Sequence, residues 1–129
     1  MELVKNHPDL YTEIVHLSFF FGWPSKPNFE KIQQHLAVAQ SIFAVEAGRV
    51  VGLITALTDK TMFAFIPLIE VIPDFQRKGI GSVLVKGMEA QLAEIYGIDL
   101  ICDSDLVPFY DELGFSQSTA MIKRNRKAL

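Results

Sequence analysis

Hydrophobic and polar positions follow two different periods along this chain of 129 residues. Apolar residues three and four apart predict helices, because that spacing places them on one helical face. The helices predicted in this way span residues 8–21, 29–40, 79–96 and 107–113. Runs rich in β-branched and aromatic residues predict strands. The predicted strands span residues 42–46, 49–58, 63–71, 98–102 and 121–124.

Turn and cap residues set the predicted boundaries of these elements. Asn28 is a good N-cap for the second helix, and Gly97 a natural C-cap for the third. Ala47-Gly48 predicts a hairpin between two strands, and Thr58-Asp59-Lys60 predicts a second turn. Pro67 cannot donate to a β-ladder, so it predicts an edge or a bulge in its strand.

The order of these elements predicts an α/β fold, an α+β sandwich with a mixed sheet. The mass of 14.5 kDa and a hydrophobic content of 50% indicate one ordered domain, residues 1–129. The net charge of −3 argues against a nucleic-acid partner. No apolar run approaches the roughly 18 residues of a membrane span, and the start lacks the layout of a signal peptide. The single cysteine, Cys102, fits a cytoplasmic location, and the histidines lack metal-ligand spacing.

The segment 76–82 carries the most informative chemistry of the chain. Its sequence, Gln-Arg-Lys-Gly-Ile-Gly-Ser, lies between a predicted strand and a predicted helix. A glycine-containing turn at a helix start exposes backbone N–H groups, and these combine with the helix dipole to form a phosphate or pyrophosphate site. The alternative is an ordinary strand-to-helix turn whose glycines only allow close packing. The segment matches neither the dinucleotide fingerprint nor the Walker A loop.

A family resemblance bears on that choice. The run 71–81, Val-Ile-Pro-Asp-Phe-Gln-Arg-Lys-Gly-Ile-Gly, resembles the acetyl-CoA-binding motif of the GNAT superfamily of N-acyltransferases. The run 109–115, Phe-Tyr-Asp-Glu-Leu-Gly-Phe, resembles the second family signature, and Asp103 lies where many members carry Asn. The resemblance implies a single GNAT-like domain with a mostly antiparallel sheet, splayed strands and flanking helices. The usual first strand has room only in residues 2–5, and the last strands look compressed.

The resemblance also implies which residues bind acetyl-CoA, the acyl donor. Backbone N–H groups of the loop would hold the pyrophosphate, and the strand before it would pair with the pantetheine amides. Arg77 and Lys78 either add charge-assisted contacts or remain solvated. The implied cofactor-binding residues are Ile69, Val71, Gln76, Arg77, Lys78, Gly79, Ile80, Gly81, Ser82, Asp103 and Tyr110.

By the same resemblance, Tyr110 is the catalytic proton donor to the leaving thiolate; the alternative is a packed core tyrosine. Glu70 is the only carboxylate on its strand and faces opposite to Ile69 and Val71. Glu70 is a general base, a counter-charge for the substrate or a strand-edge residue. A water relay is the alternative to Glu70 as the base. Phe21 and Trp23 are expected to bind the acceptor, unless their aromatic cluster is core.

The function implied is an acetyl-CoA-dependent N-acetyltransferase that acts on a small primary amine by direct attack in a ternary complex. No metal is required. A non-catalytic acyl-CoA-binding or partner-binding module of the same fold is the alternative. A homodimer is left open as the assembly state.

Overall fold

A five-stranded sheet forms the centre of the computed structural model, which describes residues 1–5, 8–10, 19–20 and 22–129. The strands lie in the order β1-β2-β3-β4-β5. The first four are antiparallel to their neighbours, and β5 is parallel to β4. Their bounds are β1 Glu2–Lys5, β2 Gln40–Glu46, β3 Arg49–Thr58, β4 Phe63–Val71 and β5 Gly97–Leu100.

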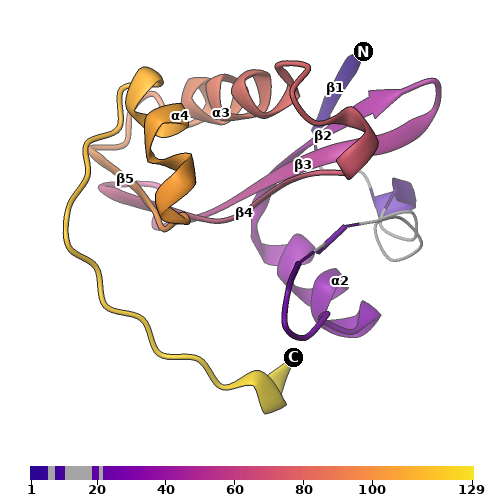
Figure 1. The fold of residues 1–129 in the computed structure, drawn as a ribbon, viewed down its shortest axis with the longest axis horizontal. Helices are drawn as coiled ribbons and strands as arrows, with labels where there is room; N and C mark the ends of the chain where they lie inside the picture. The colour runs from indigo at the N-terminus through magenta and orange to yellow at the C-terminus, as the bar shows by residue number, and fades with distance from the viewer. Residues whose placement is uncertain (6–7, 11–18, 21) are drawn as a thin grey trace.

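Helices cover both faces of this sheet (Figure 1). Helices α3 (Ile80–Gln91) and α4 (Val107–Glu112) lie on one face, and α2 (Phe29–Val38) lies on the other. Short 3-10 turns occupy Pro8–Leu10, Pro73–Phe75, Ser104–Leu106 and Arg126–Ala128. This arrangement confirms the expected α+β sandwich. No helix among the described residues has the length and apolar character needed to cross a membrane.

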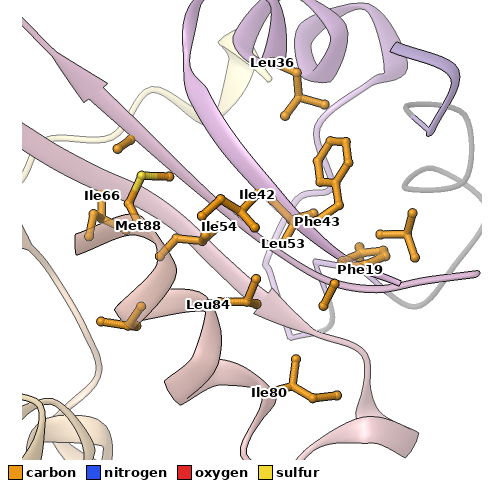
Figure 2. Close-up of a cluster of buried hydrophobic side chains, with 14 of the residues drawn as sticks. Phe19, Leu36, Ile42, Phe43, Leu53, Ile54, Ile66, Ile80, Leu84 and Met88 are labelled. Carbon is orange, nitrogen blue, oxygen red and sulfur yellow. The ribbon is translucent and has the colours of Figure 1, made fainter. Parts of the chain in front are cut away.

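The core has two layers, one on each side of the sheet. Figure 2 shows Leu84 and Met88 of α3 directed at the sheet, while Leu36 of α2 approaches Phe43 from the opposite side. Gly52 of β3 allows the close approach of α3, because an added Cβ there would lie 3.2 Å from Ile80 and Leu84 side-chain atoms. This contact fixes the start of α3 against the sheet.

The predicted hairpin turn at Ala47-Gly48 is confirmed. Both residues have positive φ, 49° and 78°, as the tight turn between two twisted strands requires. At the second predicted turn, Asp59 Oδ1 accepts hydrogen bonds from the backbone N–H groups of Thr61, Met62 and Phe63 at 2.8–3.1 Å. One short carboxylate therefore organises the entry into β4.

Pro67 lies at a bulge in β4, as predicted from its missing donor. Thr55 pairs with Leu68 but Leu57 pairs with Phe65, so β4 contributes one extra residue between these pairs. The β4–β5 ladder also stops here, because its last pair is Ile66 with Leu100. Beyond Pro67 the two strands are splayed, and residues 67–71 have no partner strand on the β5 side.

Three predicted boundaries are wrong. Helix α3 ends at Gln91, and residues 92–94 form a turn. Gly97 is not a helix cap but the first residue of β5, because its N–H bonds to the carbonyl of Met62. Strand β5 ends at Leu100 instead of residue 102, and its side chains are half-buried or exposed because nothing pairs with its outer edge in the described structure.

The predicted last strand, residues 121–124, is also wrong. The described chain is extended there and unpaired, with every residue from 116 to 129 exposed. The expected short first strand is present as β1. Most of the predicted first helix, residues 8–21, lies outside the described residues, as does Phe21.

Candidate active site

The loop after β4 has the geometry of an anion-binding turn. Arg77 and Gly79 both adopt positive φ, 62° and 83°, and α3 begins at Ile80. Within the described structure, the backbone N–H groups of residues 77–82 have no backbone acceptor. Backbone N–H groups of this kind, at the positive end of a helix dipole, are the donors that typically bind a phosphate or pyrophosphate. The structure therefore places the predicted loop residues together.

Gln76 attaches this loop to the end of β4. Its side-chain Nε2 donates to the carbonyl oxygen of Val71 at 2.9 Å. The sequence placed Gln76 among the phosphate-binding residues, and the structure gives its side chain a second role. It holds the loop across the end of the splayed strand.

Glycine is needed at the two loop positions for different physical reasons. An added Cβ at Gly79 meets nothing within 4 Å, so this position needs glycine for its left-handed φ. At Gly81 an added Cβ would lie 3.4 Å from the ring of Phe109 in α4. Gly81 thus lets α4 approach the start of α3. Phe109 is a site-forming residue that the sequence analysis named only as part of a motif.

The loop cations occupy different surroundings. Lys78 places its Nζ over the Phe75 ring, 5.0 Å from the centroid, so its ammonium stays beside the loop through a cation–π contact. Arg77 is exposed, and the structure shows no ion pair for it with any described residue.

A surface pocket of about 390 Å³ continues the site between α3 and α4. It is lined by Ser82, Lys86, Glu89, Phe109, Glu112 and Leu113. Ser82 joins this pocket to the loop, and Lys86 supplies a cation one helical turn further along. The sequence analysis did not identify Lys86. Its position four residues after Ser82 on a predicted helix was the available signal.

Tyr110 lies in α4 on the same face of the sheet as α3 (Figure 1). It is 5% exposed, and its ring contacts Phe109 and Phe115 edge-on at 4.8 Å and 5.8 Å. Burial, together with the nearby Cys102, raises the pKa of Tyr110 to about 12. The phenol therefore holds its proton throughout the neutral range. The structure shows no hydrogen-bond partner for its hydroxyl among the described residues.

Glu70 lies on the opposite face. It pairs with Leu53 of β3, and the bulge at Pro67 brings it to the same face as Phe65. Burial raises the pKa of Glu70, while hydrogen bonding with the Trp23 side chain and the Phe20 backbone opposes this by favouring the carboxylate. Glu70 is thus a half-buried carboxylate held by the segment before α2.

Trp23 connects this segment to the sheet. Its backbone N–H bonds to the carbonyl of Phe20 at 3.1 Å, and the two rings meet edge-on at 5.0 Å. Phe19 and Phe20 are core residues, which agrees with the alternative that this aromatic cluster belongs to the core. Trp23, in contrast, is 38% exposed. Trp23 therefore presents part of its indole to solvent beside Glu70.

The remaining candidates lie on β4 and in the segment after β5. Asp103 is exposed at the end of β5, and its carbonyl oxygen accepts from the Leu106 N–H. Ile69 and Val71 pair with Ile54 and Gly52, on the splayed part of β4. His35 bonds to Thr55 at 2.9 Å, a structural contact between α2 and β3. No group of three or more potential metal ligands occurs within the described ranges.

Tyr110 and Glu70 thus lie on opposite faces of the sheet. The loop and Tyr110 are on the α3 face, and Glu70 and Trp23 are on the α2 face. The two faces meet where β4 has lost β5 as a partner.

Comparisons with known proteins agree with this geometry. The model of the Acetyltransferase (GNAT) family matches residues 9–115. The uncharacterized N-acetyltransferase ycf52 of Porphyra purpurea is 30% identical over 118 residues, covering 86% of this chain and 67% of that protein. The histone acetyltransferase TAP1 of Glycine max is 29% identical over 116 residues, but this chain spans only 50% of its length.

Solved structures show the same relationship. An acetyltransferase from Deinococcus radiodurans R1 superposes with a TM-score of 0.86 at 32% identity, covering 98% of this chain and 89% of that one. A GNAT family acetyltransferase from Streptococcus pneumoniae TIGR4 gives a TM-score of 0.81 at 29% identity, covering 97% and 98%. This chain belongs to the GNAT family of N-acetyltransferases, acyltransferases that use acetyl-CoA as donor.

Proposed function

We propose that this protein transfers an acetyl group from acetyl-CoA to a small primary amine by direct attack in a ternary complex. One observation carries the proposal. Six backbone N–H groups without backbone acceptors lie at the start of α3, beside a strand that has lost its partner. The loop donors suit the pyrophosphate, and the open backbone of β4 suits the amides of an extended pantetheine.

The side chains supply the proton transfers. The amine nitrogen bonds to the thioester carbon, the carbon–sulfur bond breaks, and the sulfur leaves as a thiolate. Tyr110 donates its proton to that sulfur, and its pKa of about 12 means that the phenol is protonated at neutral pH. Glu70, or a water beside it, accepts the proton that the amine loses. Backbone N–H groups near the splay stabilise the charge that develops on the carbonyl oxygen.

The acceptor pocket is the region around Glu70 and Trp23. A half-buried carboxylate attracts an ammonium group, and the exposed part of an indole favours an apolar body or a cation. Asp103 adds a second carboxylate near the end of β5. These features favour a small amine over an extended basic protein surface. The histone acetyltransferase name of one relative makes a histone-like peptide the proper competitor in the test.

Two measurements test the proposal in sequence. Acetyl-CoA at 100 times its dissociation constant should raise the free energy of unfolding by about 2.7 kcal/mol, because only the native state binds it. Product mass and free-thiol release are then measured with polyamines, arylalkylamines, amino-acid amines and histone-tail peptides. Acetylated small amines support the proposal.

The negative outcomes are distinct. A thermal shift with no product from any amine points to the non-catalytic binding module. If millimolar acetyl-CoA causes no thermal shift, the assignment of acetyl-CoA as the acyl donor is wrong. A peptide acetylated faster than every small amine leaves the chemistry intact but overturns the acceptor class.

A further inference from the structure

Cys102 lies directly beyond β5, at the point where that strand separates from β4. The last pair of the β4–β5 ladder joins Ile66 to Leu100. Phe65 is on the α2 face, so its neighbour Ile66 and the paired Leu100 face α3 and α4. Cys102 comes two residues after Leu100, is half-buried and packs against the same core. Its side chain is therefore on the face of the sheet that carries Tyr110.

Tyr110 has an unpartnered hydroxyl on this face. The residue is only 5% exposed, and its hydroxyl has no hydrogen-bond partner among the described residues. The oxygen is nevertheless not among the described polar atoms that are sealed from solvent without a partner. Burial is the larger cause of its raised pKa of about 12, and the nearby Cys102 is the other. The phenol and the thiol thus lie near one another, and the phenol is free to contact a ligand.

The acyl donor brings a sulfur to this place. In the proposed function, Tyr110 protonates the departing thiolate of coenzyme A, so that sulfur lies beside the phenol and near Cys102. Cys102 is the only cysteine of the chain, so no internal disulfide competes with a bond to an outside sulfur. A thiolate attacks a disulfide sulfur held next to it faster than one free in solution, because binding replaces a bimolecular encounter.

The charges around Cys102 favour a disulfide that the protein binds. Residues 93–115 contain no basic side chain, and their acidic residues are Glu94, Asp99, Asp103, Asp105, Asp111 and Glu112. These carboxylates repel an anionic disulfide that nothing holds in place. Coenzyme A is also anionic, but the loop at residues 77–82 offers its phosphates backbone donors and the cations of Arg77 and Lys78.

We propose that Cys102 is a modification site at which this protein forms a mixed disulfide with coenzyme A, and that the adduct reversibly blocks the donor site. The inference rests on the proposed function, because it needs the donor sulfur beside Tyr110. The co-reactant is a disulfide of coenzyme A with a second small thiol. The Cys102 thiolate attacks the coenzyme A sulfur, the old S–S bond breaks, and the second thiol leaves as a thiolate that takes up the proton from Cys102. One disulfide replaces another, so no further oxidant is needed.

The first test compares two probes on the full chain. The 2-pyridyl disulfides of coenzyme A and of glutathione are both anionic and have the same leaving group. Release of pyridine-2-thione measures the rate, and the intact mass identifies the adduct. The coenzyme A probe should react at least about 100-fold faster, because the loop holds it beside Cys102. It should add one coenzyme A per chain, be slowed by saturating acetyl-CoA and be removed by dithiothreitol. Equal rates for the two probes would overturn the proposal.

Variants locate the reaction. Cys102→Ser leaves the chain without a thiol, so it should form no adduct with either probe. Gly79→Ala keeps Cys102 but strains the donor loop, and it should slow the coenzyme A probe toward the rate of the glutathione probe. Gly48→Ala has the same strain in the β2–β3 turn and should react like the wild type. A coenzyme A rate unaffected by Gly79→Ala would contradict delivery of the probe by the loop and would overturn the proposal.

The thermal shift with acetyl-CoA distinguishes failure of this inference from failure of the proposed function. A wild type that acetyl-CoA stabilises, but that shows no preference for the coenzyme A probe, supports the donor assignment and overturns the Cys102 site. A wild type that shows neither effect overturns both. Acetyltransferase activity should fall in parallel with adduct formation and return with dithiothreitol. Fully modified protein that keeps its activity would show that the adduct does not block the donor site.

Discussion

The side-chain amide of Gln76 donates to the carbonyl oxygen of Val71 at 2.9 Å, which joins the first residue of the glycine loop to the last residue of β4. Val71 is where the splayed strand ends, and the six backbone donors begin immediately after Gln76. One hydrogen bond thus joins the loop to the unpaired end of β4.

Gln76→Ala should weaken acetyl-CoA binding about fivefold, because one hydrogen bond that orients the loop is worth about 1 kcal/mol. Isothermal titration calorimetry measures the dissociation constant. Gln34→Ala is the matched control, since Gln34 is an exposed glutamine on α2 on the other face of the sheet. Equal affinities for the two variants would show that the Gln76 contact does not position the loop.

Gly79→Ala should lower both stability and acetyl-CoA affinity. The left-handed φ of 83° costs a residue with a Cβ about 1–2 kcal/mol, and the new methyl group would stand among the loop donors. Gly48→Ala has the same strain, with φ 78° and open space around the added Cβ, but lies in the β2–β3 turn. Thermal unfolding with and without acetyl-CoA separates the two effects. Both variants should lose similar stability, and only Gly79→Ala should lose the ligand-induced shift.

Tyr110→Phe should lower kcat by roughly 10²–10⁴-fold with little change in acetyl-CoA affinity, because it removes a proton donor but keeps the ring. The packing of the ring against Phe109 and Phe115 is retained. Since the pKa of Tyr110 is raised to about 12, its deprotonation should not reduce wild-type turnover at pH 9. A kcat unchanged by the substitution would leave Tyr110 with a packing role alone.

Glu70→Gln tests the raised pKa of Glu70 through stability. A carboxyl whose folded pKa lies above its unfolded value favours folding when protonated, and this contribution is lost as pH rises through the folded pKa. The variant should therefore gain stability relative to wild type at pH 7 and lose that gain below about pH 4. Urea unfolding at the two pH values measures the difference.

The same variant tests catalysis by Glu70. A general base must be ionised, so the acid-side limb of the wild-type kcat profile should follow the Glu70 pKa, and Glu70→Gln should remove that limb and lower kcat. An unaltered profile with normal turnover would favour the water relay.

Trp23→Ala should raise the KM of the acceptor amine about tenfold, because a cation over an indole face gains about 0.5–2 kcal/mol. The KM for acetyl-CoA should not change, since the loop donors lie on the opposite face of the sheet. Trp23→Phe keeps an aromatic ring but removes the N–H that favours the Glu70 carboxylate. It should preserve most of the acceptor affinity while moving the acid limb to higher pH. A KM unaffected by either substitution would place the acceptor elsewhere.

The sequence alone determined the elements whose signals are local. The hairpin at Ala47-Gly48 follows from a short turn that contains glycine, and the turn before α3 follows from glycines between a strand and a helix. The bulge at Pro67 follows from its missing donor. The two motifs, in the right order, were sufficient to indicate the GNAT family, which the comparisons confirm.

The tertiary structure decided whatever depends on residues distant in sequence. Strand β5 begins at Gly97 because it must pair with Phe63, and this pairing converts an expected helix cap into a strand residue. Glu70 and Phe65 share a face only because β4 has a bulge in its pairing with β3. The close approach of Phe109 to Gly81 depends on where α4 packs. Residues 121–124 have a strand-like sequence but no strand beside them in the described chain. A β-strand exists only through its neighbour, so sequence pattern can specify its propensity but not its pairing.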